Sequence, residues 1–135
     1  MLKYQCTISI SDSKESFYCD NPVDSNATKP SPRELLLGSL GSCTAMTIRT
    51  YFENSQVRST SWRESKLDAI HVRIEEEMGA DLHVPIGIKL HIQLYGHLSA
   101  AQIESLKRAA DLCPVKRMIT GNNGNSSYIR TQISI

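Results

Sequence analysis

Two stretches in the middle of the chain alternate hydrophobic and polar residues with a period of two. Residues 70–75 read Ile-His-Val-Arg-Ile-Glu, and hydrophobic residues recur at every second position through residues 86–94. This period is typical of strands with one buried face. Because Gly-Ala-Asp at 79–81 is typical of a turn, the pattern predicts a hairpin. Its polar face carries His71 and His91, which the turn is expected to place opposite each other.

The two ends of the chain show the same alternation over shorter segments. Residues 3–19 are predicted to form a hairpin, and residues 128–135 a closing strand. If the hairpin loop consists of residues 12 and 13, Cys6 lies opposite Cys19. Three interpretations of that pair stay open: a disulfide bridge, a second redox pair, or two small half-buried side chains, the last being the usual case in a reducing compartment.

A helical period replaces the alternation after the first hairpin. Ser31 suits an N-cap, Pro32 suits the first helical position, and Glu34 completes a capping box. The helix is predicted to end near Phe52, and residues 56–66 are predicted to be a polar connection. Hydrophobic and small residues recur on one face of this helix: Leu36, Leu40, Cys43, Thr47 and Tyr51.

Small residues surround Cys43 within this helix. Gly38 and Gly41 each cost about 1 kcal/mol relative to alanine in a helix interior, which is tolerated where a backbone or a substrate must approach closely. A break in the helix between these glycines would place Cys43 near the start of a second helix. Without such a break, Cys43 lies deep in one helix, and the helix dipole has little effect on it.

Two further helices are predicted before the closing strand. Ser99 and Gln102 form another capping box, which begins a helix that Cys113-Pro114 interrupts. Proline favours the first position of a helix, so a short helix should follow from residue 114 and stop at Gly121. Cys113 then lies at its N-cap.

Composition and charge exclude several classes of function. The chain has 135 residues, 40% of them hydrophobic and 21% charged, which predicts one compact domain spanning residues 1–135, and the predicted helices and strands make it an α+β domain. A net charge of +1 offers no electrostatic attraction for a nucleic acid. No stretch has the roughly 20 apolar residues that span a bilayer, and the first residues do not resemble a signal peptide. We therefore expect a cytoplasmic protein whose cysteines are thiols.

The local sequence favours Cys113 over Cys43 as a reactive thiol. Unsatisfied amides at a helix N-terminus and nearby cations both lower a thiol pKa, and Cys113 has a helix start with Lys116 and Arg117 one turn later. The other interpretation of Cys113 is a small apolar plug at a helix junction. Cys43, by contrast, resembles a buried structural cysteine.

No motif indicates a metal or a cofactor. The four cysteines lack the paired spacing of a zinc site, and no phosphate loop or dinucleotide fingerprint is present. A metal site formed by His71 and His91 lacks a further ligand at suitable spacing, so exposed strand histidines are the expected interpretation. We therefore expect no cofactor.

Two segments resemble the cysteine motifs of the OsmC/Ohr family of hydroperoxide-reducing proteins, and more narrowly its OsmC-like branch. The first is KPSPRELLLGSLGSCTAMTIRTYFE at residues 29–53, and the second is LCPVKRMITG at residues 112–121. Their cysteines stand 70 residues apart, with a predicted strand hairpin between them. The predicted order of elements also agrees with that fold.

The resemblance implies a fold and an activity. The implied fold is α+β, with an antiparallel sheet wrapped around central helices in an intertwined homodimer that has its active sites at the interface. Cys43 takes the peroxidatic role and attacks an organic hydroperoxide, and Cys113 then forms a disulfide with it. An external dithiol reductant reopens the disulfide.

The chain departs from the family in the groups that hold the thiolate. The peroxidase branch uses an arginine from the N-terminal strands and a glutamate ten residues before the first cysteine. Here position 33 is arginine, Glu34 follows it, and no arginine precedes Arg33. Arg33 and Glu34 are therefore the candidates for supporting the thiolate, although Glu34 also serves as a capping-box residue.

Two other functions fit the sequence. The first is a non-catalytic OsmC-like dimer that binds a small ligand or acts in a stress response, which the missing arginine favours. The second is a cysteine hydrolase with a histidine base, but no motif places any of the four histidines for that role.

Overall fold

The computed structural model describes residues 6–9, 16–19, 28–121 and 127–135, the first two segments by their backbone alone. These residues belong to two compact units, residues 1–39 and residues 40–135, and the division lies within the long helix α1. The prediction of a single domain stays a prediction.

The first unit contains a two-stranded hairpin and the start of α1 (Pro32–Arg58). The strands β1 (Cys6–Ser9) and β2 (Ser16–Cys19) pair antiparallel, with Cys6 opposite Cys19. The predicted register is thus confirmed, while the predicted loop at residues 12 and 13 lies outside the described residues. The predicted start of α1 is also confirmed: the Ser31 Oγ accepts the Glu34 N–H at 3.2 Å, and the Glu34 Oε1 accepts the Ser31 N–H at 3.4 Å.

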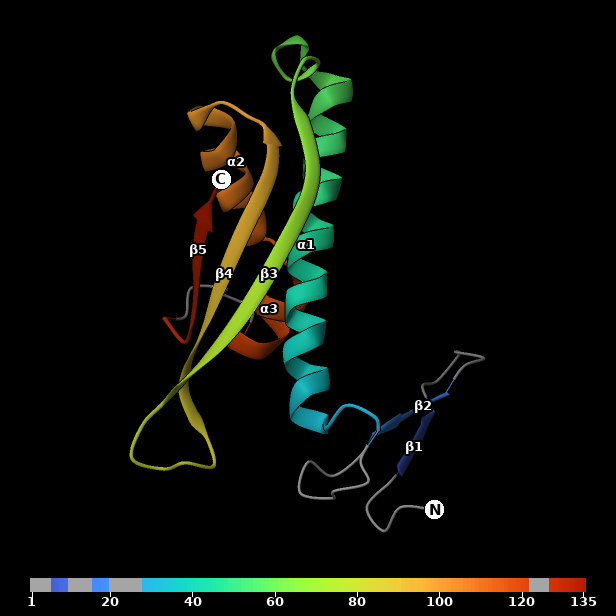
Figure 1. The fold of residues 1–135 in the computed structure, drawn as a ribbon, viewed down its shortest axis with the longest axis vertical. Helices are drawn as coiled ribbons and strands as arrows, with labels where there is room; N and C mark the ends of the chain where they lie inside the picture. Colours follow the sequence, from blue (N-terminus) through green and yellow to red (C-terminus); the bar gives the residue numbers. More distant parts are fainter. Residues whose placement is uncertain (1–5, 10–15, 20–27, 122–126) are drawn as a thin grey trace. The chain divides into compact units, whose positions relative to one another are not determined.

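The second unit is built on a three-stranded sheet (Figure 1) in the order β3-β4-β5. The strands β3 (Lys66–Met78) and β4 (Pro85–His97) form the predicted antiparallel hairpin, and β5 (Ile129–Ser134) joins the other edge of β4. β5 runs parallel to β4, so the sheet contains one parallel pair that the sequence did not indicate.

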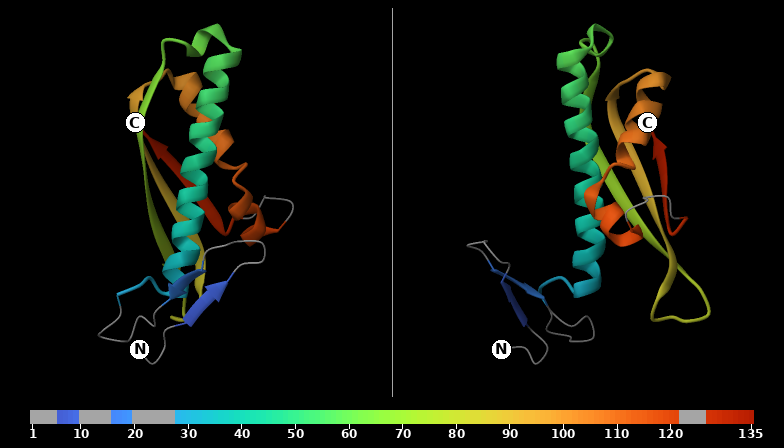
Figure 2. Two further views of the ribbon diagram at one scale, coloured as in Figure 1. Left: turned by 90° about the vertical axis from the view of Figure 1, so that its right-hand side faces the viewer. Right: turned by 180° about the vertical axis from the view of Figure 1, so that it is seen from behind.

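The helices of this unit cover one face of the sheet. Figures 1 and 2 show α1, α2 (Ala100–Ala110) and α3 (Pro114–Thr120) on the same side of the strands. β4 supplies the centre of the core because its inward residues are at most 3% exposed: Ile88, Leu90, Ile92 and Leu94. The unit is therefore a helical layer on a sheet, which confirms the α+β class.

The helix α1 is longer than predicted. It continues without a break to Arg58, so Cys43 lies in the helix interior and not near the start of a second helix. Tertiary contacts hold the extra turns: Gln56 Nε2 donates to the carbonyl oxygens of Trp62 at 3.3 Å and Ser65 at 2.9 Å. Trp62 itself is buried in the short 3-10 helix Thr60–Trp62. The polar residues at the end of α1 were predicted to be a connection because the hydrophobic pattern does not show these contacts with Trp62 and Ser65.

The buried face of α1 differs from the predicted one. In the second unit its buried residues are Leu40, Gly41, Thr44, Ile48 and Phe52. Tyr51, predicted on the same face as Leu40, is instead 37% exposed. Gly41 is part of the buried face: an added Cβ would lie 2.9 Å from the Cδ1 of Ile74, so the missing side chain lets β3 approach here. The buried face thus combines the large side chains of Leu40, Ile48 and Phe52 with the small residues Gly41 and Thr44.

The two shorter helices begin as the sequence predicted. Ser99 and Gln102 make both bonds of the capping box at the start of α2. Pro114 is the first residue of α3, Cys113 is its N-cap, and Gly121 ends it with a φ of +86°, a conformation that glycine adopts without strain. Local capping signals were therefore reliable guides to helix boundaries.

The polar face of the sheet carries the two strand histidines, but not opposite each other. His71 pairs with Gln93, and His91 pairs with Arg73. His91 Nε2 lies 2.8 Å from the Glu75 carboxylate, while the ring of His71 lies 4.8 Å from that of Tyr95. Within the described parts of the chain, no three His, Cys, Asp or Glu residues group to hold a metal ion.

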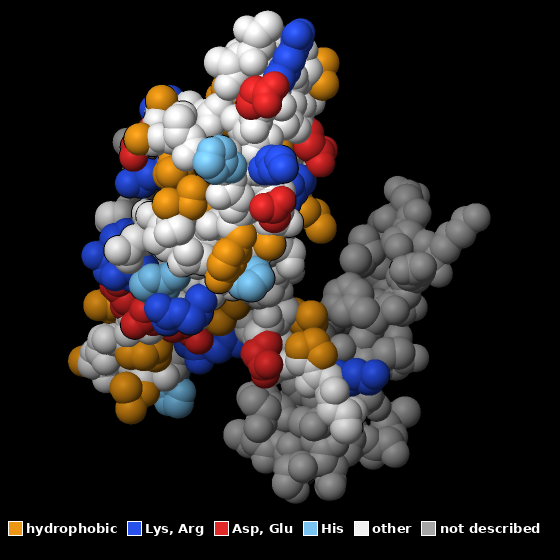
Figure 3. Space-filling model, turned by 45° about the horizontal axis from the view of Figure 1, so that its top comes forward, with side chains coloured by type: hydrophobic (Ala, Val, Ile, Leu, Met, Phe, Trp, Pro, Cys, Tyr) orange, Lys and Arg blue, Asp and Glu red, His pale blue; other side chains and the backbone are white. Residues whose placement is uncertain are grey.

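Charged side chains are dispersed on the face seen in Figure 3. Lys and Arg side chains lie among Asp and Glu there and form no large patch of one sign. This dispersion agrees with the small net charge. Across the described residues, none of the helices is both long enough and apolar enough to cross a bilayer.

Candidate functional site

The fold brings together the two cysteines of the two sequence motifs. Cys43 lies near the middle of α1, and Cys113 is the N-cap of α3. Both are free thiols, Leu112 and Pro114 on either side of Cys113 line the same groove as Cys43, and the Cys43 thiol is near enough to raise the pKa of Cys113. Residues 70 positions apart in sequence thus form one pair of sulfur atoms in the second unit.

The two thiols differ in how far solvent reaches them. Cys113 is 0% exposed, whereas Cys43 is of intermediate exposure. Because Cys43 lies at the edge of the inward face of α1, its side chain also lines a groove on the outside. A small molecule entering that groove meets Cys43 before it meets Cys113.

Burial reverses the prediction for the Cys113 thiol. Loss of hydration is the largest influence and raises the pKa of Cys113, and the neighbouring Cys43 thiol raises it further. The Lys116 N–H and the Thr44 hydroxyl lower the pKa, but they do not outweigh burial. The Lys116 N–H points toward the sulfur without the geometry of a cap hydrogen bond. Of the two interpretations that the sequence left open, the burial and the raised pKa of Cys113 favour a small apolar side chain at the helix junction over a thiol activated by the helix start.

The cation expected to act on Cys113 is bound elsewhere. Lys116 is only 4% exposed, and its Nζ donates to the Asp111 carboxylate. Arg117, the second predicted cation, is exposed. The Lys116–Asp111 ion pair spans the connection between α2 and α3, which contains Cys113. The Lys116 ammonium therefore holds this connection together more than it stabilises a charge on the Cys113 sulfur.

The groove beside Cys43 has a volume of about 410 Å³. Its lining contains no charged residue among the described part of the chain and comes from α1 and from the start of α3: Cys43, Met46, Thr47, Thr50, Tyr51, Asn54, Leu112 and Pro114. An uncharged lining of this kind suits an apolar molecule that carries a small polar group.

The candidates for thiolate support lie in the first turn of α1. The Glu34 carboxylate accepts the Ser31 N–H, as expected for a capping-box residue. Arg33 is exposed. Both residues belong to the first unit, whereas the cysteine pair belongs to the second. Their support of the thiolate therefore stays a prediction.

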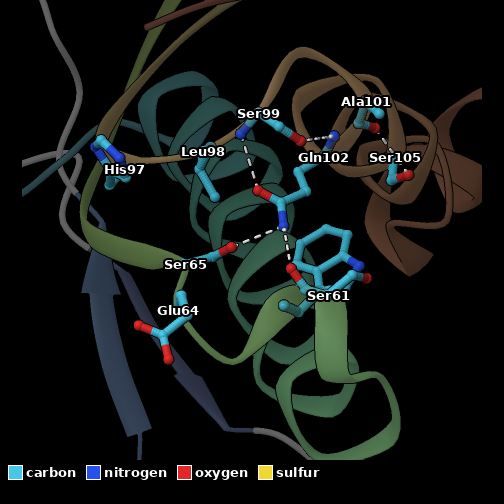
Figure 4. Close-up of a pocket in the computed structure, with 10 residues that line it drawn as sticks. Ser61, Glu64, Ser65, His97, Leu98, Ser99, Ala101, Gln102 and Ser105 are labelled. Atoms are coloured by element: carbon cyan, nitrogen blue, oxygen red, sulfur yellow. Dashed lines mark hydrogen bonds between the residues drawn. The ribbon is translucent and has the colours of Figure 1, made fainter.

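A second and larger hollow of about 500 Å³ contains neither thiol. It lies between the N-terminus of α2 and the start of β3 (Figure 4), around the side chain of Gln102. Gln102 Nε2 donates to the Ser65 Oγ at 2.7 Å and to the Ser61 carbonyl oxygen at 3.1 Å. Its Oε1 accepts the Ser99 N–H at 2.8 Å. These polar groups satisfy one another, so they stabilise the fold and present no evident chemistry.

The sequence analysis did not identify two residues that shape the site. Thr44 is fully buried on α1 and its hydroxyl lowers the pKa of Cys113, while Asp111 binds Lys116. The signal for Thr44 was its position directly after the motif cysteine Cys43. The signal for Asp111 was only its spacing of five residues from Lys116, which does not identify an ion pair.

Comparison with known proteins agrees with the two motifs. The family model described as OsmC-like protein matches residues 24–125, which include both cysteines. No curated protein matches the chain.

Solved structures share the fold at low sequence identity. An OsmC-like protein from Mycoplasma pneumoniae is 14% identical, with a TM-score of 0.64 over 98% of this chain and 96% of its own. A putative osmotic stress induced and detoxification response protein from Psychrobacter arcticus is 19% identical, with a TM-score of 0.69 over 96% of this chain and 85% of its own.

A third solved structure with this fold is an organic hydroperoxide resistance protein. The organic hydroperoxide resistance protein OhrB of Bacillus subtilis is 15% identical, with a TM-score of 0.55 over 96% of this chain and 94% of its own. The family model covers most of the chain, and the fold matches that of these structures. The chain therefore belongs to the OsmC-like protein family.

Proposed function

We propose that the protein reduces organic hydroperoxides with Cys43 as the attacking thiol and Cys113 as its resolving partner. The observation that carries the proposal is that Cys43 and both chain neighbours of Cys113, Leu112 and Pro114, line one uncharged groove. Two structures with the same fold are organic hydroperoxide resistance proteins, from Bacillus subtilis and Legionella pneumophila, which points to the same class of substrate.

The first step takes place at Cys43. Its thiolate attacks the terminal oxygen of the hydroperoxide, the O–O bond breaks, and the alkoxide leaves and takes up a proton to become an alcohol. Cys43 is then a sulfenic acid. The assignment of this step to Cys43 is supported by its exposure to the groove, since Cys113 is fully buried.

The second step joins the two sulfurs. The Cys113 thiolate attacks the sulfur of the sulfenic acid, a disulfide forms, and hydroxide leaves and is protonated to water. An external dithiol then reduces the disulfide, with two electrons and two protons restoring both thiols. This step is supported by the position of Cys43 in the groove that Leu112 and Pro114, the chain neighbours of Cys113, also line.

The lining of the groove supports a preference for organic hydroperoxides over hydrogen peroxide. Met46, Tyr51 and Leu112 offer apolar surface to an alkyl or aryl group, and burying such surface contributes about 25 cal/mol per Å². Hydrogen peroxide has no such group. The preference should therefore appear in the KM for the peroxide.

The activity is proposed for a homodimer. The outer face of α1 and α3 exposes large hydrophobic side chains in the second unit, with Met46 at 69%, Val57 at 83% and Met118 at 81% exposure. Such a surface is unfavourable in water and is typical of a protein interface. Since Met46 also lines the groove, a second copy covering this surface would close the site from water.

A direct assay tests the proposal. The reduced protein is mixed with cumene hydroperoxide or with hydrogen peroxide, and peroxide consumption and free thiols are measured together. We expect loss of two thiols per peroxide consumed, and faster reaction with cumene hydroperoxide. Survival of all thiols with no peroxide consumed would reject the proposal.

A second candidate function is binding of an apolar ligand without catalysis. It is favoured by the lining of the groove, where no described residue provides a cation for a thiolate. A dimer of this kind would bind an uncharged ligand equally well after Cys43→Ser. Retained ligand binding together with inert thiols in the peroxide assay would select this function.

A further inference from the structure

The groove beside Cys43 follows α1 for about three turns. Its residues on this helix are spaced so that they form one stripe: Cys43, Met46, Thr47, Thr50, Tyr51 and Asn54. Because each residue of an α-helix adds about 1.5 Å, Cys43 and Asn54 are about 16 Å apart along the axis. Cys43 is the first residue of this stripe, and Asn54 is the last.

The stripe between Cys43 and Asn54 offers apolar surface. Met46 is exposed there, and the ring of Tyr51 is held by an edge-to-face contact with the ring of Trp62, with centroids 6.1 Å apart. The Thr47 hydroxyl is already bonded, because it donates to the Cys43 carbonyl oxygen at 2.8 Å. An alkyl chain along this stripe would therefore bury apolar surface without displacing that hydrogen bond.

Asn54 provides a polar group at the far end of the stripe. Its side chain is exposed and makes no hydrogen bond with another described residue. Side chains of an α-helix lean toward its N-terminus, so the amide leans along the groove toward Cys43. A side-chain amide has two N–H donors and one carbonyl acceptor, and it carries no charge. It is therefore suited to a polar and uncharged group of a ligand.

Charged side chains near Asn54 do not line the groove. Glu53 and Arg58 are exposed and lie outside its lining, and the Arg49 guanidinium donates to the Leu67 carbonyl oxygen. A carboxylate placed in the groove would lose hydration without gaining a cation among the described residues of the lining. An ester or a hydroxyl group loses less hydration and can bond to the Asn54 amide.

We propose that Asn54 is a specificity-determining residue, which selects organic hydroperoxides that have a long apolar chain and an uncharged polar group at its far end. An extended chain advances about 1.2 Å per bond, so about twelve carbons reach from Cys43 to Asn54. The inference deepens the proposed function and rests on it for the reaction at Cys43. That reaction is the first step above: the O–O bond breaks, one oxygen stays on sulfur, and the alcohol leaves.

The first test compares three hydroperoxides that differ only at the far end. They are the methyl ester of ω-hydroperoxydodecanoic acid, the free acid, and dodecyl hydroperoxide, each kept below micelle formation. Peroxide consumption by the protein with an excess of dithiol gives kcat and KM. We expect a KM for the ester about tenfold below that for the acid at neutral pH, because the carboxylate loses hydration. A lower KM for the acid would overturn the proposal.

Asn54→Leu separates the hydrogen bond from the apolar contact. Loss of a neutral hydrogen bond should raise the KM for the ester about fivefold. The KM for dodecyl hydroperoxide, which has no polar end, should not rise. The kcat for both should be unchanged, because Asn54 lies at the other end of the stripe from the thiol. An equal rise of KM for both substrates, or no rise for the ester, would overturn the proposal.

A charge variant with a matched control tests the far end again. Asn54→Lys places a cation there, so the free acid should now have the lower KM. Glu53→Lys makes a larger change of charge at the neighbouring exposed position outside the lining, and it should keep the preference for the ester. An unchanged preference in Asn54→Lys, or the same reversal in Glu53→Lys, would overturn the proposal.

Binding of the reaction products separates this inference from the proposed function. The methyl ester of ω-hydroxydodecanoic acid and the free hydroxy acid are titrated into the reduced protein by calorimetry, with no peroxide present. We expect the ester to bind about tenfold more tightly, and equal binding would overturn the role of Asn54. If the protein consumes no hydroperoxide, the proposed function fails, and this titration still decides the selectivity of the groove.

Discussion

The surroundings of Cys43 and Cys113 are the reverse of what their local sequences suggest. Cys113 has a helix N-terminus and two following cations, yet it is fully buried and its pKa is raised. Cys43 lies in the interior of α1, yet it lines the groove. The comparison teaches that burial outweighs the end of a seven-residue helix as an influence on a thiol.

The difference also suits two consecutive roles. An attacking thiol must meet its substrate, and a resolving thiol must stay protected from that substrate until its partner is oxidised. A raised pKa keeps Cys113 protonated, and therefore unreactive toward peroxide, in the reduced protein. The groove beside Cys43 and the buried position of Cys113 are therefore consistent with the proposed attacking and resolving roles.

Replacing the exposed member of the pair should have the largest effect. Cys43→Ser is expected to abolish peroxide reduction, because a serine hydroxyl is not ionised at neutral pH and Cys113 is not accessible from the groove. Peroxide consumption in the presence of a dithiol is the measurement. Activity that persists in this variant, with Cys113 oxidised, would reverse the assignment.

Replacing the buried member should remove only the second step. Cys113→Ser is expected to consume the first equivalent of cumene hydroperoxide and then to carry Cys43 on to the sulfinic acid as peroxide is added. The mass of the Cys43 peptide measures this. A sulfenic acid that is still converted to a disulfide in this variant would show that another cysteine resolves it.

Breaking the ion pair beside Cys113 should have an intermediate effect on stability. Asp111→Asn leaves the ammonium of the buried Lys116 without its carboxylate. Because Asp111 is half-exposed, we expect a loss of about 1–2 kcal/mol in the free energy of unfolding, below that of a fully buried pair. Urea unfolding measures it, and no loss would show that solvent already supports the ammonium.

The smallest expected effect is the dependence of stability on pH through Cys113. Folding raises the pKa of this thiol, so its contribution to stability is complete below the pKa of the unfolded chain, near 8.5. That contribution is lost as the pH rises through the higher folded value. The advantage of the unaltered protein over Cys113→Ala in urea unfolding should therefore shrink above about pH 8.5, and an advantage that grows with pH would contradict the raised pKa.

Much of the fold was predictable because its signals are local. Ser31 and Ser99 mark two helix starts, Cys113-Pro114 marks a third, and a period of two marks the central hairpin. The direction of β5 and the last turns of α1 were not predictable. The last turns of α1 depend on contacts such as that of Gln56 with Ser65, and the direction of β5 on its pairing with β4, which the local pattern does not contain.

The candidate site was predictable in its members but not in its electrostatics. Resemblance to a family singled out Cys43 and Cys113, and the fold brings them together. The local sequence could not show that Lys116 binds Asp111 or that Thr44 is fully buried on α1.

The central claim is that these two thiols act as one redox unit, and one measurement tests it most directly. The reduced protein is treated with one equivalent of cumene hydroperoxide, and its peptides are analysed by mass spectrometry without reduction. We predict a linked peptide pair that joins Cys43 to Cys113 within one chain. Unlinked Cys43 and Cys113 peptides, whether both thiols are intact or Cys43 alone is oxidised, would contradict the claim.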